Sequence, residues 1–184
     1  HLAYERGAQG ISAFNFTYYR RFGEKVIGTA CEPPFHVFRH LGDECWIARQ
    51  NQHYFLSSRD YVGNVIKGKY NADTRKQIKL DMAPPAQGWD NTGRLRIQAD
   101  DNLRGTRIRV KFNGNELKSS SDISEFYPVG NPDALGNEYN LKAWVLPAKF
   151  LKDGINTITI EPSDDIVITY IDIGLKNKVK GNHG

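Results

Sequence analysis

Apolar and polar residues alternate with a period of two along much of the chain after residue 76. The first runs are QIKLDM at 77–82, RLRIQAD at 94–100 and RIRVKF at 107–112. Successive side chains of a strand point to opposite faces, so each run gathers its apolar residues on one face and its charged residues on the other. The pattern predicts antiparallel sheets that are buried on one side only.

Three further strand-like runs follow. They are YNLKAWVL at 139–146, NTITIEP at 156–162 and IVITYIDIGL at 166–175, and the last is apolar on both faces. Asn113-Gly114 and Asp153-Gly154 are turn signals, because these residue types tolerate positive φ. Short strands separated by turns predict a mainly β fold, an antiparallel β-sandwich, whose last strand is central or covered.

The first 60 residues have a different texture. GISAFNF at 10–16 has the composition of a buried strand, and a polar, glycine-bearing loop follows it. PPFHVFRHL at 33–41 predicts a helix, because two prolines suit a first turn and its apolar residues recur at helical spacing. Gly42 is expected to end this helix. A second short turn is expected at Glu44–Arg49, with Trp46 facing inward.

The chain is therefore predicted to have three parts. Residues 1–60 form a terminal α/β segment, residues 61–176 form the β-sandwich, and residues 177–184 form a polar tail. A chain of 184 residues is long enough to bury a sizeable core without disulfides or metals.

Composition and charge remove two classes of partner. Hydrophobic residues make up 39% and charged residues 25%, as in ordinary globular proteins. The net charge of +4, from 25 basic and 21 acidic residues, is spread along the chain rather than gathered into a stripe. Nucleic acid is therefore not an expected partner. No run approaches the roughly 18 apolar residues that span a bilayer, so a membrane is not expected either.

Cysteine and histidine leave open questions. Cys31 and Cys45 are the only cysteines, and their spacing allows either a disulfide or two buried free thiols, which leaves the redox compartment undecided. His36 and His40 lie four positions apart on the predicted helix, a spacing that can hold a metal. HVFRH lacks the glutamate of the HExxH arrangement, and no third ligand is evident. A solvated or capping role is therefore favoured, and no metal is predicted.

No catalytic constellation stands out. The sequence has no nucleophile elbow, no phosphate-binding loop and no recognised Cys/His pair. Glycosidic cleavage needs two carboxyl groups that flank one bond. Asp100-Asp101 and Asp164-Asp165 are adjacent doublets at expected turns, and the glutamates of the first 60 residues end no recognisable strand. We therefore predict no catalytic residue in this chain.

Aromatic residues interleaved with polar ones are more informative. Sugar rings stack their C–H faces on aromatic rings, while Asp, Asn and Arg bond the hydroxyls, and loops concentrate such residues. AQGWDNTG, SEFYPVGNPDALGNEY and FNFTYYRR have this character. The candidate sugar-binding residues are Trp89, Asp90, Tyr127, Asn131, Asn15, Tyr18, Tyr19 and Arg20. The alternative for Trp89 and Tyr127 is to cover the edge of the core, and Trp144, within a strand, is expected inside it.

Several stretches resemble parts of known protein families. ERGAQGISAFNFTYYR and PPFHVFRHLGDECWIARQNQHYFL resemble the last strand and helix of a TIM barrel in bacterial, family-10-like glycoside hydrolases, where a β-sandwich follows the barrel. LKAWVLPAKFLKDGINTITIEP and IVITYIDIGLK resemble the late strands of galactose-binding-like jelly rolls. The resemblance covers roughly residues 4–58 and 139–176. It implies that the family's catalytic carboxylates lie on earlier barrel strands, which this chain lacks.

The resemblance implies a non-catalytic C-terminal β-sandwich that binds a polysaccharide or oligosaccharide, or that supports an upstream catalytic barrel of the same protein. A second interpretation is that residues 15–20 line the substrate cleft of the intact glycoside hydrolase. A third is a cell-surface interaction module. The implied location is extracellular, periplasmic or at the cell surface. No cofactor is expected, and a structural calcium stays open, although no loop has a convincing set of ligands.

Overall fold

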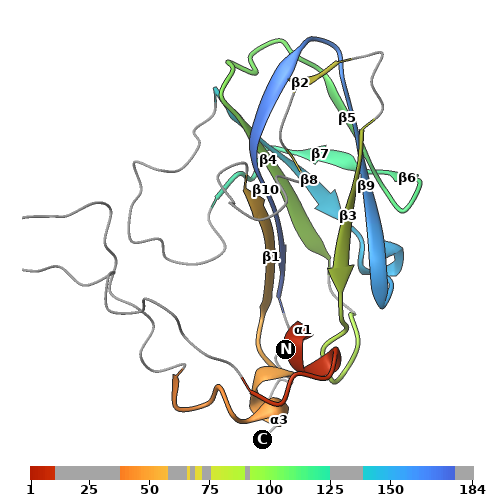
Figure 1. Cartoon of the computed structure of the whole chain (residues 1–184). Coiled ribbons are helices and arrows are strands. Elements are labelled where there is room, and N and C mark those ends of the chain that lie inside the picture. The colour runs from red at the N-terminus through yellow and green to blue at the C-terminus, as the bar shows by residue number, and fades with distance from the viewer. Residues whose placement is uncertain are drawn as a thin grey trace, which may run out of the picture.

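The computed structural model describes residues 1–10, 38–57, 66, 69–71, 76–89, 92–124 and 139–176. Strands dominate these ranges, and they pair into antiparallel sheets that form a β-sandwich (Figure 1). The mainly β fold class that the alternation predicts is therefore confirmed. The predicted strand at 10–16 and most of the predicted helix at 33–41 lie outside the described residues.

Six strands form the larger sheet, in the order β1-β10-β4-β8-β7, with β2 also paired to β10. Their bounds are Gln52–Ser57 for β1, Lys69–Tyr70 for β2, Gly93–Ala99 for β4, Lys118–Ser120 for β7, Leu141–Leu146 for β8 and Ile166–Leu175 for β10. The smaller sheet has the order β3-β9-β5-β6. Its strands are β3 (Lys76–Met82), β5 (Ile108–Phe112), β6 (Asn115–Glu116) and β9 (Gly154–Pro162).

The core lies between the two sheets, because the apolar face of each alternating strand is turned toward the other sheet. Ile78 on β3 and Phe112 on β5 are fully buried residues of the smaller sheet, and Ile97 on β4 is a fully buried residue of the larger sheet. Trp144 on β8 is 2% exposed, which confirms its predicted place in the core. The last strand, β10, pairs with β1 and β4 on its two sides and is therefore central, as predicted.

The predicted hairpin turn is also present. Asn113 has φ of 47° and Gly114 has φ of 83°, so both residues adopt the left-handed conformation that joins β5 to β6. Ala148–Phe150 forms a short 3-10 turn, η3, between β8 and β9. The residues that favour turns thus mark where strands end, and the alternating residues mark the strands between them.

The described residues before β1, 1–10 and 38–51, lie at one end of the sandwich (Figure 1), and we call them the N-terminal segment. Figure 1 shows the short helices α1 (Leu2–Glu5) and α3 (Glu44–Ile47) beside the ends of β1 and β3. The helical turn predicted from Glu44 is present as α3, with Trp46 half-buried. β1 lies within the segment that we expected to precede the sandwich, and it pairs along its whole length with β10.

Candidate functional site

A groove lies where the edges of the two sheets meet the N-terminal segment. It has a volume of about 440 Å³, which is within the range of small-molecule sites. One wall is β1, the edge strand of the larger sheet, and the opposite wall is β3, the edge strand of the smaller sheet. α1 and the residues after α3 close one end. The lining combines apolar and polar side chains, among them Leu2, Ile47, Gln50, Asn51, His53, Tyr54, Phe55, Leu80 and Asp81.

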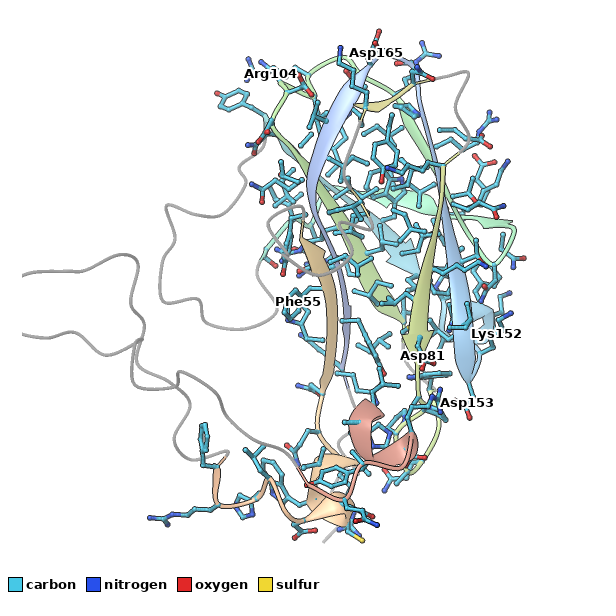
Figure 2. The ribbon with its side chains drawn as sticks, in the orientation of Figure 1. Phe55, Asp81, Arg104, Lys152, Asp153 and Asp165 are labelled. Atoms are coloured by element: carbon cyan, nitrogen blue, oxygen red, sulfur yellow. The ribbon has the colours of Figure 1, made fainter. Side chains whose placement is uncertain are left out.

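Phe55 is the exposed aromatic residue of this groove. It is 57% exposed, although phenylalanine is mostly buried in folded proteins. Figure 2 shows it projecting from β1, away from the interior of the sandwich. Its ring stacks beside Tyr170 of β10, with centroids 6.2 Å apart, and lies 5.9 Å from the ring of His53. The three rings lie on the outer face of the larger sheet, and we call them the Phe55 rim. His53 and Phe55 also line the groove along the edge of β1, whereas Tyr170 of β10 lies beside it.

Hydrogen bonds to one backbone position fix the floor of the groove. The hydroxyl of Tyr54 donates to the carbonyl oxygen of Ala83 at 3.1 Å and accepts from its N–H at 3.3 Å. Gln52 donates to the same carbonyl at 3.1 Å, and the indole N–H of Trp89 donates to Gln52 Oε1 at 2.9 Å. Burial raises the pKa of Tyr54, so its hydroxyl stays a donor at neutral pH. The floor is therefore rigid before any ligand arrives.

A buried charge network on the neighbouring strands β10 and β4 holds the ring of His53 in place. Asp172 on β10 accepts two hydrogen bonds from the guanidinium of Arg96 on β4, at 2.9 and 2.5 Å, and lies 3.0 Å from Nε2 of His53. Arg96 and Asp172 are only 2% and 3% exposed at their side chains. Arg96 also donates to the backbone carbonyls of Ile123 and Ser124, at 3.1 and 3.2 Å. Two strands and the segment after β7 are thus tied to the ring of His53.

The electrostatics of Asp172 follow from this network. Burial alone would raise the pKa of its carboxyl group, but the hydrogen bonds from Arg96 and His53 outweigh burial and lower it. Asp172 is therefore ionised at neutral pH, and both of its oxygens accept hydrogen bonds. Because Asp172 stays ionised, the network positions His53 and does not supply a proton at neutral pH.

Acid should destabilise the protein through this carboxylate. Because the folded state lowers the pKa of Asp172 below its ordinary 3.8, its stabilising contribution is present above that value and is lost as the pH falls through the folded pKa. We expect the free energy of unfolding in urea to fall steeply below about pH 4, and less steeply in Asp172→Asn. The dependence should not vanish in the variant, because Arg6 lowers the pKa of Asp81 and Ser124 lowers that of Asp122. An identical pH profile in the variant would contradict this account.

Among the described residues that line the groove, Asp81 is the one carboxylate, and it is already paired. Arg6 donates to both oxygens of Asp81, at 2.9 and 2.8 Å, and to Asp153 at 2.8 Å. Figure 2 shows the two aspartates together at this end of the sandwich, beside α1. A pair of free carboxyl groups, as glycosidic cleavage requires, is not found among the groove residues that the structure describes. The arrangement can bind and orient a ligand.

Of the sequence-predicted binding residues, Trp89 alone lies within the described ranges. It is half-buried and packs against the core, as the alternative interpretation expected, and it meets the groove only through Gln52. The remaining predicted residues lie outside the described residues, and their role stays a prediction: Asp90, Tyr127, Asn131, Asn15, Tyr18, Tyr19 and Arg20.

Sequence reasoning missed Phe55 and His53. Both belong to QHYFLS at 52–57, which does not alternate between apolar and polar residues. Its short run of Tyr, Phe and Leu is compatible with a strand, but from the sequence we assign this stretch to the end of the α/β segment. Their proximity to Asp172 could not be read from the sequence, because it depends on the pairing of β1 with β10.

The described residues show neither a metal-binding cluster nor a membrane-spanning helix. Within the described ranges, no group of three or more His, Cys, Asp or Glu side chains could hold a metal ion. His40 stacks on Trp46 with ring centroids 4.3 Å apart. Cys45 is a free thiol and is exposed rather than buried, and Cys31 lies outside the described residues. No helix in the described part of the chain is both long enough and apolar enough to cross a membrane.

Comparisons with known proteins give a likeness in structure and none in sequence. No protein-family model and no curated protein sequence matches the chain. A β-porphyranase of glycoside hydrolase family 86 from the human gut bacterium Bacteroides plebeius is similar in structure, with 14% sequence identity and a TM-score of 0.44. The match covers 71% of this chain and 21% of that one, so this chain spans about a fifth of the length of its structural neighbour. The family-10-like and galactose-binding-like resemblances stay predictions.

Proposed function

We propose that this chain is a non-catalytic carbohydrate-binding β-sandwich, and that the groove between β1 and β3 is its binding site. The observation that carries the proposal is the exposed Phe55 rim beside a preformed groove that has polar groups on both sides. An exposed phenylalanine offers a flat apolar surface for the C–H face of a sugar ring. Polar groups around an apolar surface then fix the orientation of the ligand.

The polar lining suits neutral hydroxyl groups. Gln50 and Asn51 carry amides, which have both donor and acceptor atoms, and His53 adds an imidazole whose Nε2 is already paired with Asp172. Arg6 pairs with Asp81 and also with Asp153, so one positive charge faces two carboxylates at this end of the groove. An anionic ligand would therefore gain no net attraction from these three residues, whereas a sugar hydroxyl can pair with either kind of atom.

A structural role is the second candidate, and the packing of the N-terminal segment favours it. Arg6 bridges Asp81 of β3 and Asp153 before β9, and His1 Nε2 lies 2.5 Å from the carbonyl oxygen of Pro84. The backbone N–H of Ala86 also donates to the carbonyl of Ala48 at 3.1 Å. These contacts fix the sandwich to the segment before it, as a scaffold for an adjoining catalytic barrel would require.

Phe55→Ala should abolish most of the binding while leaving the fold intact. Burying a phenylalanine side chain against a ligand contributes about 1.5–3 kcal/mol, so we expect affinity to fall roughly ten- to a hundredfold. A glycan array should first identify a neutral oligosaccharide, and titration calorimetry should then compare the variant with the unaltered chain.

Tyr139→Ala is the matched control, because Tyr139 is also an exposed aromatic residue, at 40%, but does not line the groove. Its affinity should match that of the unaltered chain. Equal affinity in Phe55→Ala would remove the groove as the binding site. Silence of the unaltered chain across plant, algal and host glycans would overturn carbohydrate binding and favour the scaffold.

A further inference from the structure

A second hollow lies on the outer face of the larger sheet. It has a volume of about 260 Å³ and shares no lining residue with the groove. Arg94 of β4 forms one wall, and the strand pairing places Arg94 opposite Gly174, which in turn lies opposite His53. Two strand spacings, about 10 Å, therefore separate the hollow from the Phe55 rim. We call this second feature the Arg94 hollow.

An ion pair with fixed geometry forms one side of the Arg94 hollow. Arg94 Nη1 lies 2.5 Å from Asp122 Oδ2, and Ser124 donates to the other carboxylate oxygen from its hydroxyl at 2.6 Å and from its N–H at 3.0 Å. The hydrogen bonds from Ser124, followed by the charge of Arg94, lower the pKa of Asp122, so the carboxylate is ionised at neutral pH. The side chain of Asp122 is 62% exposed while that of Arg94 is 11% exposed. The carboxylate thus stays accessible to a ligand.

The rest of the lining indicates the chemical class of the ligand. Thr92, Ser120 and Ser124 bring hydroxyl groups, Lys176 brings an ammonium group, and Val145 is an apolar side chain that is 37% exposed. An ionised carboxylate accepts short, strong hydrogen bonds from hydroxyl groups, and the paired guanidinium of Arg94 offsets its charge. Donors and acceptors beside a small apolar surface match a neutral sugar unit.

The segment that carries Asp122 is held to the buried centre of the sheet. Arg94 donates to the backbone carbonyls of Asp122 and Ser124, and Arg96 donates to those of Ile123 and Ser124. Because Arg96 is itself fixed by Asp172, the segment is anchored before a ligand binds. A preformed site loses less conformational entropy on binding than a mobile one.

We propose that the Arg94 hollow is a second carbohydrate-binding site, which takes one neutral sugar unit through hydrogen bonds from its hydroxyls to Asp122. The ligand class rests on the proposed function, but the residues are different, so the two proposals can fail separately. Two sites in one domain raise the apparent affinity for a polymer that presents many copies of the same sugar.

The test is calorimetric titration of the full chain with cellotetraose, xylotetraose, mannotetraose and β-1,4-galactotetraose. We expect at least one of them to occupy two sites per chain. Asp122→Asn should weaken the second site about ten- to a hundredfold, because a hydrogen bond to a charged group is lost, and should leave the groove unchanged. Asp165→Asn is the matched control, since Figure 2 places this exposed aspartate at the opposite end of the sandwich from Asp81.

The outcomes separate the two proposals. Loss of all binding in Phe55→Ala, with Asp122→Asn unchanged, would overturn the second site and leave the groove in place. A single site per chain for every tetrasaccharide that binds would also overturn the second site. No binding of any of the four would overturn the second site, while the glycan array still decides the groove. Stronger binding of a sulfated tetrasaccharide in Asp122→Asn than in the unaltered chain would overturn the neutral ligand class.

Backbone amide shifts give a second measurement that needs no variant. Addition of the bound tetrasaccharide should shift the amide resonances of Ser120, Asp122 and Ser124 together, with a saturation curve separate from that of Asn51 and His53. Unmoved resonances at Ser120, Asp122 and Ser124 under saturating sugar would overturn the second site.

Discussion

Replacing Arg96 with methionine should lower the free energy of unfolding by about 3–5 kcal/mol, because it leaves the buried carboxylate of Asp172 without its main partner. Asp172 is 3% exposed, so water cannot replace the two hydrogen bonds from the guanidinium. The same change removes the donors for the carbonyls of Ile123 and Ser124. Urea unfolding at neutral pH, followed by tryptophan fluorescence, measures the effect.

A double variant separates loss of the pair from loss of packing. Arg96→Met with Asp172→Leu removes both charges, and replacing a buried ion pair with apolar residues is often neutral or stabilising. We expect the double variant to be more stable than Arg96→Met alone, and a double-mutant cycle gives the coupling between the two residues.

Arg109→Met is the control for this experiment. Arg109 also pairs with acidic residues, Glu116 and Glu161, but its side chain is 59% exposed. Its effect should stay within about 0.5 kcal/mol. A loss of less than about 1 kcal/mol in Arg96→Met would show that water or another group satisfies Asp172.

Trp144→Ala should also destabilise the sandwich by about 3–5 kcal/mol, through a cavity in the core. Trp144 is 2% exposed and belongs to the cluster that both sheets build. The cost should appear as a lower midpoint in thermal and urea unfolding. Trp89→Ala should cost less, because Trp89 is only half-buried at the edge of this cluster.

Val145→Ala is the neighbouring control on the same strand. Val145 follows Trp144 and points to the other face of β8, where it is 37% exposed. We expect a change within about 0.5 kcal/mol. A comparable loss in both variants would mean that β8 as a whole, rather than the indole of Trp144, is sensitive to substitution.

The sandwich could be predicted because its signals are local. The strands β3, β4, β5 and β9 each carry their own alternation, β8 and β10 are apolar runs near turn residues, and Asn113-Gly114 carries its own turn. Where a strand alternates, its apolar face can be buried in only one way. Trp144 was predictable as a core residue because it lies within a strand. β1 escaped prediction because it does not alternate and follows a stretch that resembles a barrel helix.

The candidate sites could not be predicted, because they depend on which strands become neighbours. The residues of the central network, His53, Arg96 and Asp172, are spread over almost 120 positions of the sequence. They meet only because β1 and β4 pair with opposite edges of β10 in a register that sets Phe55 and Arg96 across from Asp172. A charged residue in an alternating strand reads as solvent-facing, and the sequence pattern gives no sign that the outer face would bury this pair.

The sequence by itself thus determined the class of the fold and the order of its main strands and turns, since these depend on periodicity and on residues that are adjacent in the chain. The tertiary structure alone decided which polar residues share a network, which aromatic residue stays exposed, and where the groove and the Arg94 hollow lie. Those features arise from strand order and register, and long-range pairing brings together side chains whose local sequence context carries no mark of the contact.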